Sequence, residues 1–206
     1  MKKLTIIFSL LLFGVISAQS IKYGVTGNFH KTSIVGIHDR SKGIFGGSVG
    51  VFADFALVTN DIYDSAWLYF TPQLEFAMQG ENAKMPNQDL QKYHYNYIGL
   101  PLYIKYFIRN HGYKSDIYLM AGPRLEYMVS DKVSGPTSLT AAQEENLTKF
   151  GYGVSVAAGV KIQENWDIFI RFDRGFANIY PDYTKYSTYN RMLGIGINYY
   201  LGTANY

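Results

Sequence analysis

The chain of 206 residues contains no cysteine. This absence excludes a disulfide framework, a thiol nucleophile and the acylated cysteine of a lipoprotein. After the first twenty residues no apolar run reaches 18 residues, which argues against a later α-helical membrane span. Dense runs of lysine or arginine are also missing, so nothing in the sequence supports nucleic-acid binding. No proline- or serine-rich linker divides the chain into two domains.

The chain does have repeated alternation of apolar and polar residues with a period of two, which is the pattern of β-strands. Eight such stretches predict strands near residues 22–30, 45–57, 67–78, 94–109, 116–130, 149–162, 166–174 and 189–201. The connections between them are alternately long and short, with roughly 14, 9, 15, 6, 18, 3 and 14 residues. An even number of strands, with long connections at one end and short ones at the other, is typical of bacterial outer-membrane barrels. The 19 tyrosines and 13 phenylalanines fit the aromatic girdles of such barrels.

The two faces of each predicted strand favour a barrel in lipid over a soluble barrel. The last strand, for example, sets Leu193, Ile195 and Ile197 against Gly194 and Gly196. A soluble barrel of the lipocalin type would bury the apolar face and present many lysines and glutamates on the other face. That other face here carries glycines, tyrosines and isolated charges, and small residues fit the inside of a narrow barrel. We therefore expect an all-β, eight-stranded, antiparallel up-and-down transmembrane barrel with its apolar face toward lipid.

The first 18 residues have the order of a secretory signal peptide. Lysines at positions 2 and 3 precede an apolar run from Leu4 to Ile16, and small residues follow at positions 17 and 18. As a helix, this run would span only about 20 Å, which is shorter than the hydrocarbon core of about 30 Å. We expect cleavage after Ala18, residues 19–206 as one barrel domain, and a location in the outer membrane. Loss of two lysines lowers the formal charge from +3 to +1, so net charge does not indicate an anionic partner.

With the apolar face outward, a set of charged side chains points into the barrel, four acidic and four basic. These residues are Asp54, Glu75, Lys105, Arg124, Glu126, Lys161, Arg171 and Asp173. Chain direction places Asp54, Lys105 and Lys161 near the periplasmic end and the others at mid-height or above. An unpaired charge in a narrow lumen of low dielectric is unfavourable by several kcal/mol. A structural network of ion pairs is the favoured interpretation, because eight strands enclose little more space than their side chains fill. A path for protons or ions is the alternative.

Five segments resemble a family of small bacterial barrels. They are YIGLPLYIKYFI (97–108), IYLMAGPRLEYMV (117–129), FGYGVSVAAGVKI (150–162), IRFDRGFANI (170–179) and LGIGINYYLG (193–202). In their order and spacing they are similar to the PorT-like outer membrane protein β-barrel domain group of Bacteroidetes. The resemblance implies an eight-stranded barrel of a Gram-negative outer membrane, in a group that includes a secretion-assembly factor. It also implies insertion by the barrel-assembly machinery. The tail GTANY (202–206) departs from the usual terminal aromatic signal, because Tyr206 is out of register with the last strand.

The sequence offers little for catalysis or for a bound cofactor. The four histidines are His30, His38, His94 and His111, and none is followed two residues later by serine, the spacing associated with lipid A deacylase barrels. No G-x-S-x-G motif is present. Asp61 and Asp64 fit turn chemistry, and the glycines are not gathered in a phosphate-binding loop. We therefore predict no enzyme activity, no metal site and no cofactor.

The most consistent function is that of a non-enzymatic barrel with a side-chain-filled polar lumen. Its role would be structural, or would consist of presenting four long extracellular loops to an extracellular or secretion-system partner. Tyr180, Tyr183, Tyr186 and Tyr189 recur every three residues in the last loop. They are either interfacial anchors or a sugar- or protein-contacting surface. A narrow porin-like solute conduit and an accessory of a secretion system are the alternative functions, and outer-membrane lipids are the expected surroundings.

Overall fold

The computed structural model describes residues 21–36, 41–58, 66–84, 90–110, 113–135, 147–182 and 186–204. The predicted signal peptide, its cleavage after Ala18, His38, His111 and Tyr183 lie outside these residues. So does the tail at Tyr206. In the part of the chain that is described, no helix is long and apolar enough to cross a membrane.

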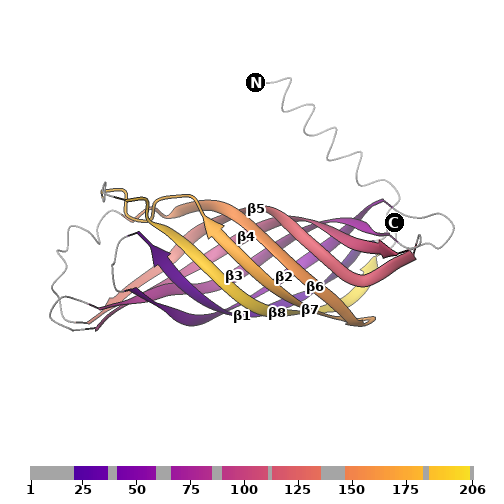
Figure 1. The fold of residues 1–206 in the computed structure, drawn as a ribbon, viewed down its shortest axis with the longest axis horizontal. Coiled ribbons are helices and arrows are strands. Elements are labelled where there is room, and N and C mark those ends of the chain that lie inside the picture. The colour runs from indigo at the N-terminus through magenta and orange to yellow at the C-terminus, as the bar shows by residue number, and fades with distance from the viewer. Residues whose placement is uncertain are drawn as a thin grey trace, which may run out of the picture.

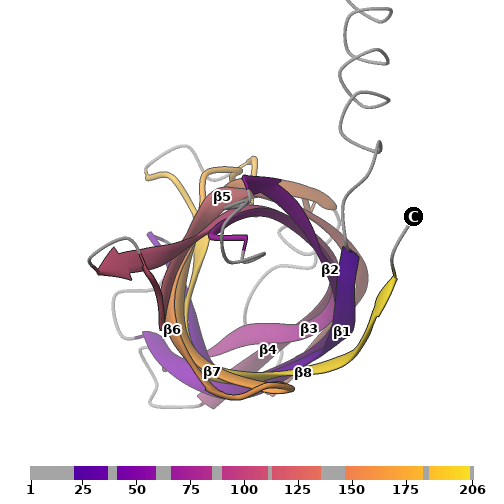
Figure 2. The ribbon, with the colours of Figure 1, turned by 90° about the vertical axis from the view of Figure 1, so that its right-hand side faces the viewer.

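Eight strands form one closed antiparallel barrel (Figure 1). The strands are β1 (Ile21–Val35), β2 (Ser41–Val58), β3 (Leu68–Lys84), β4 (Leu90–Asn110), β5 (Tyr113–Ser134), β6 (Phe150–Gln163), β7 (Trp166–Gly175) and β8 (Tyr189–Ala204). Each strand pairs with its neighbour in sequence, and β1 also pairs with β8. Seen along its long axis, the sheet makes a complete ring (Figure 2). The predicted fold is confirmed.

The strands are longer than the apolar pattern predicts, and this corrects the prediction of four long extracellular loops. Only the connections 135–149 and 176–188 are long; the connections 36–40 and 85–89 each contain five residues. The reason is that β-pairing continues above the apolar band on polar and aromatic residues. In β4, for instance, Tyr93 and Tyr95 face inward and His94 faces outward, although no apolar residue faces outward there. Much of the expected loop is therefore regular sheet.

The wall has an apolar outside and a polar, aromatic inside. Leu100 and Ile195, which the sequence places outward, are 38% and 53% exposed. Inward glycines make room for inward rings on the neighbouring strand: Gly196 lies opposite Phe169, and a side chain at position 196 would collide with that ring. The lumen of an eight-stranded barrel is narrow, so large and small residues alternate across its strands.

The ladder between β2 and β3 is interrupted near the extracellular end. Pairing passes from Gly43 with Glu81 directly to Ser48 with Ala77. Across this gap, Thr32 of β1 replaces the missing strand contact, because its hydroxyl donates to the Gly80 carbonyl (2.8 Å) and accepts from the Gly80 amide (3.0 Å). Gly80 has a φ of 148°, a backbone conformation that glycine tolerates best.

Candidate functional site in the barrel interior

Lys105 is the centre of a charged layer near the periplasmic end. It lies on β4, and its Nζ is 3.2 Å from Asp54 Oδ2 of β2 and 3.1 Å from Asp167 Oδ2 of β7. It also donates to the Tyr200 hydroxyl (2.6 Å), which is 2.9 Å from each of the same two carboxylates. The ring of Tyr118 lies 4.2 Å from Nζ and adds a cation–π contact. All five side chains are buried, so this layer ties five strands together across the interior.

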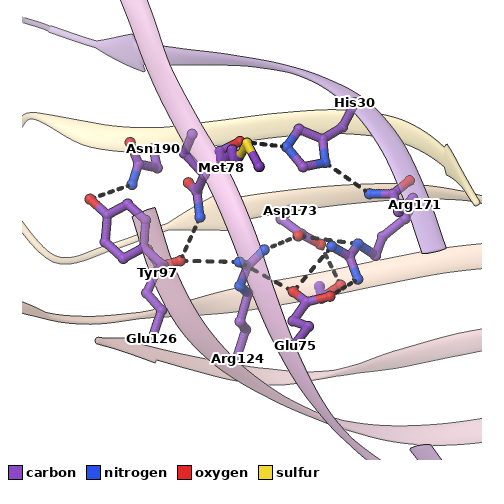
Figure 3. Close-up of polar contacts among 12 residues, drawn as sticks. His30, Glu75, Met78, Tyr97, Arg124, Glu126, Arg171, Asp173 and Asn190 are labelled. Atoms are coloured by element: carbon purple, nitrogen blue, oxygen red, sulfur yellow. Dashed lines mark hydrogen bonds and ion pairs between the residues drawn. The ribbon is translucent and has the colours of Figure 1, made fainter. Parts of the chain in front are cut away.

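A second charged layer lies at mid-height and is built around two arginines (Figure 3). Arg171 forms a two-pronged ion pair with Glu75, at 2.8 and 3.2 Å. Arg124 contacts the same Glu75 at 3.3 Å and Glu126 at 3.2 Å. Both guanidinium groups also contact Asp173. Planar guanidinium groups match carboxylates in this fork geometry, which fixes the orientation of both partners.

Hydrogen bonds extend this layer to neighbouring strands. Gln79 donates to Glu126 at 3.0 Å, and Ser155 donates to Asp173. Tyr103 and Ser155 share a hydrogen bond of 2.6 Å. Because charged groups buried together need such additional partners to be stable, these bonds make the layer a connected polar network rather than a set of isolated pairs.

An aromatic layer closes the interior at the extracellular end. Tyr93, Tyr95 and Tyr97 of β4 are buried there, together with Ile179 and Tyr180 from the connection between β7 and β8. The Tyr95 and Tyr180 hydroxyls are 2.6 Å apart. The connection is fixed by backbone hydrogen bonds from Thr148 to the Ile179 carbonyl and from Ile179 to the Thr188 carbonyl. Burial raises the pKa of the Tyr180 hydroxyl, and the neighbouring Tyr95 adds to this effect.

Cavities in the interior are small except at the periplasmic mouth. A cavity of about 270 Å³ opens there and is lined by Lys22, Lys161, Asp54 and Tyr200 among others. It ends at the Lys105 layer. Two cavities beside Glu126, one of them also lined by Arg124, have volumes of about 10 Å³ each, the space of about one water molecule.

The structure places the eight predicted residues as follows. Asp54 and Lys105 meet in the lower layer; Glu75, Arg124, Glu126, Arg171 and Asp173 meet at mid-height. Lys161 is separate from both groups: it is half-buried at the periplasmic mouth and lines the cavity there. Sequence reasoning missed Asp167, although it shares the strand parity of Arg171 and Asp173 and faces the same interior. With Asp167 included, the two layers contain five carboxylates and three cations.

The histidines do not form a pair. His30 is buried inside the barrel, where its Nε2 is 2.8 Å from the Met78 carbonyl, whereas His94 is exposed on the outer surface. These two histidines therefore lie on opposite sides of the wall and cannot act together at one site. In the described ranges, no group of three histidine, aspartate or glutamate residues has the geometry to hold a metal ion.

The sequence matches the family model "Outer membrane protein beta-barrel domain" over residues 17–181. The chain belongs to this family. Members of the outer membrane protein β-barrel domain family are integral barrels, so the apolar outer surface described above lies against outer-membrane lipid. No match was found among curated proteins.

Solved structures of similar fold come from several bacteria. Neisserial surface protein A has 13% identity and a TM-score of 0.48, with 87% of this chain and 96% of that chain covered. OprG from Pseudomonas aeruginosa has 10% identity and a TM-score of 0.49, with coverages of 89% and 95%. Ail, the attachment invasion locus protein of Yersinia pestis, solved with the heparin analogue sucrose octasulfate, has 11% identity and a TM-score of 0.42, with coverages of 89% and 99%. Likeness at this level transfers no residue role to this chain.

Proposed function

We propose that this outer-membrane barrel is closed to solutes and non-enzymatic, and that it acts through its extracellular surface on a partner outside the cell or in a secretion system. Within the family, we propose that the chain belongs to the PorT-like group of Bacteroidetes. We also propose that residues 1–18 are a signal peptide cleaved after Ala18. The barrel-assembly machinery then inserts residues 19–206.

The layered interior carries the proposal that the barrel is closed. A solute would have to pass the Lys105 layer, the Arg124 and Arg171 layer and the tyrosine layer in turn. Each layer joins strands on different sides of the barrel through hydrogen bonds or ion pairs. Opening either charged layer would leave buried charges without partners, which is strongly unfavourable. Seven of the eight predicted lumen residues, all except Lys161, therefore have a structural role in this proposal.

Planar-bilayer recording tests the closed lumen. We expect the wild-type protein, purified and refolded, to give no reproducible single-channel steps. The matched positive control is a variant in which Glu75, Arg171 and Asp173 are all replaced by alanine, which removes the centre of the mid-height layer. Its conduction would show that the assay detects an opened barrel. Reproducible steps from the wild-type protein would support the porin-like conduit instead.

Two further measurements address the remaining alternatives. Incubation of purified protein with lipid A and phospholipids should leave both unmodified, because His30 and His94 lie on opposite sides of the wall. A modified product would reject the non-enzymatic function. Deletion of the gene, followed by comparison of secreted proteins, tests the secretion-system role, and unchanged secretion would remove that role.

A further inference from the structure

Four cations gather on one side of the outer surface, just above the lipid-facing apolar band. Arg174 of β7 and Arg191 of β8 lie directly opposite each other in the ladder. Lys31 of β1 lies opposite Leu193, two residues below Arg191 on the neighbouring strand, and Lys42 of β2 is nearby. We call Lys31, Lys42, Arg174 and Arg191 the cationic arc. All four residues are exposed, and none of them forms an ion pair with another described residue.

The height of the arc matches a membrane interface. Trp166 and Tyr199 are paired near the periplasmic ends of β7 and β8, with ring centroids 4.5 Å apart. Arg174 and Arg191 are each eight residues further along the same strands. At about 3.3 Å per residue and a tilt of about 40°, eight residues rise about 20 Å. This is close to the height of an apolar barrel band, about 25 Å, so the arc lies at the headgroups of the outer leaflet.

The arc is unfavourable unless an anion binds there. Like charges directly opposite each other in a ladder destabilise a sheet. Arg174 is partly stabilised by the Tyr189 ring, 5.1 Å from its guanidinium carbon, but this contact does not neutralise its charge. On the other side of the barrel, the positions that follow the apolar band are neutral, such as Asn82 on β3 and Asn96 on β4. Exposed cations are present there too, such as Lys92 on β4 and Lys132 on β5, but neither lies opposite another lysine or arginine in the ladder, as Arg174 and Arg191 do.

The surface between these cations is an open groove with a cationic part and an apolar part. It has a volume of about 770 Å³ and is lined by Lys31, Ser33, Lys42, Gly43, Phe172, Arg191 and Leu193. Phe172 and Leu193 form its apolar lower part, opposite each other in the β7–β8 ladder, and the cations lie above them. Just beyond it on β1 and β2, the rings of Phe29 and Phe45 stack at 5.5 Å.

We propose that the cationic arc binds the phosphorylated headgroup of an outer-leaflet glycolipid, with the phosphates against Lys31, Arg174 and Arg191 and the acyl chains along Phe172 and Leu193. A guanidinium group can donate two parallel hydrogen bonds to a phosphate, and clusters of basic residues beside a membrane-spanning apolar segment recognise anionic lipids. Lipid A combines the two required parts, phosphates attached to a diglucosamine and acyl chains beneath it. Binding would replace the repulsion between Arg174 and Arg191 by two attractive contacts.

The test uses full-length mature barrel in detergent micelles and native mass spectrometry with three ligands: bis-phosphorylated lipid A, the same lipid A without its phosphates, and inorganic phosphate. The arc variant, K31Q/R174Q/R191Q, removes three of the four arc cations, and K92Q/K132Q removes two exposed cations from β4 and β5 as a control. Each basic residue contributes about fivefold to affinity for an anionic lipid. We expect the arc variant to bind bis-phosphorylated lipid A about 100-fold more weakly than wild type and the control variant to bind it normally.

Several results would overturn the proposal. One is retention of lipid A by the arc variant within threefold of the wild-type affinity. Another is equal binding of lipid A with and without phosphates, which would indicate acyl-chain contact alone. Binding of inorganic phosphate as tightly as lipid A would indicate a soluble anion instead of a lipid. Heat-modifiable gel migration checks folding, and if the arc variant does not fold, the single substitution R191Q should weaken binding about fivefold.

Discussion

Replacing Lys105 by methionine is the sharpest perturbation of the lower charged layer. Methionine keeps most of the volume and the apolar stem of lysine but removes the cation. Asp54 and Asp167 would then lie close together in the interior, with only the Tyr200 hydroxyl between them. Since all of these groups are buried, the two carboxylates would lose the ammonium group between them in a poorly hydrated interior.

The magnitude follows from the two short ion pairs. At 3.1 and 3.2 Å and an effective dielectric constant of about 20, each carboxylate is attracted to Lys105 by about 5 kcal/mol. Repulsion between the carboxylates and the desolvation of three ions offset much of this attraction. Removing one member of such a buried group lowers the free energy of unfolding by about 3–5 kcal/mol. We expect a loss in this range for K105M.

Urea unfolding in lipid vesicles, followed by tryptophan fluorescence, measures the effect. The variant K105M/D54N/D167N is the matched control, because it removes both charges that K105M leaves without a partner. Its free energy of unfolding should lie within about 1–2 kcal/mol of the wild-type value, since replacing a whole group of buried ions by neutral side chains changes stability little. A loss below about 1 kcal/mol for K105M, or no recovery in the triple variant, would refute this account of the layer.

Three further substitutions test other layers of the structure. G196V should lower the free energy of unfolding by about 1–3 kcal/mol because its side chain meets the Phe169 ring, and the second substitution F169L should restore part of the loss. Y180F removes the hydroxyl hydrogen bond to Tyr95 and should lower the free energy of unfolding by about 1 kcal/mol, with faster proteolysis in the connection 176–188. Unchanged proteolysis would contradict closure of the extracellular end by this connection. T32V leaves the Gly80 amide without its acceptor, so hydrogen exchange at this amide should be faster and the free energy of unfolding should fall by about 1–3 kcal/mol. Unaltered exchange would mean that the amide has another acceptor.

The sequence predicts the membrane-spanning part of the fold well because lipid imposes a strict period of two on one face. Alternation in β8 identifies Leu193 and Ile195 as outward residues, and alternation in β7 identifies Arg171 and Asp173 as inward residues. Asp167 follows this parity too, but it lies next to a tight turn, where the alternation has just begun. Lys161 has inward parity, yet it lies at the mouth, where its long side chain reaches water instead of a carboxylate.

The extracellular part could not be predicted in the same way. Above the lipid there is no apolar requirement on the outer face, so the β4 residues before Ile98 carry no outward hydrophobic signal although they are paired in the sheet. The contact between Tyr95 and Tyr180 joins residues 85 positions apart, and tyrosines in a loop have no pattern that assigns one of them to the interior. Which atoms pair across the lumen likewise depends on the barrel's register, which emerges only when the ring is closed.

The length of β4 and β5 has a consequence for molecular recognition at the cell surface. The outward apolar residues of β4 extend from Ile98 to Ile108, but the strand begins at Leu90. Eight residues of strand at about 3.3 Å each, tilted by about 40°, project about 20 Å above the lipid. A ligand that docks on this projecting part of the sheet meets backbone that is already held by hydrogen bonds between strands. Its association loses less conformational entropy than docking on an unstructured segment of equal reach would, which favours long-lived complexes.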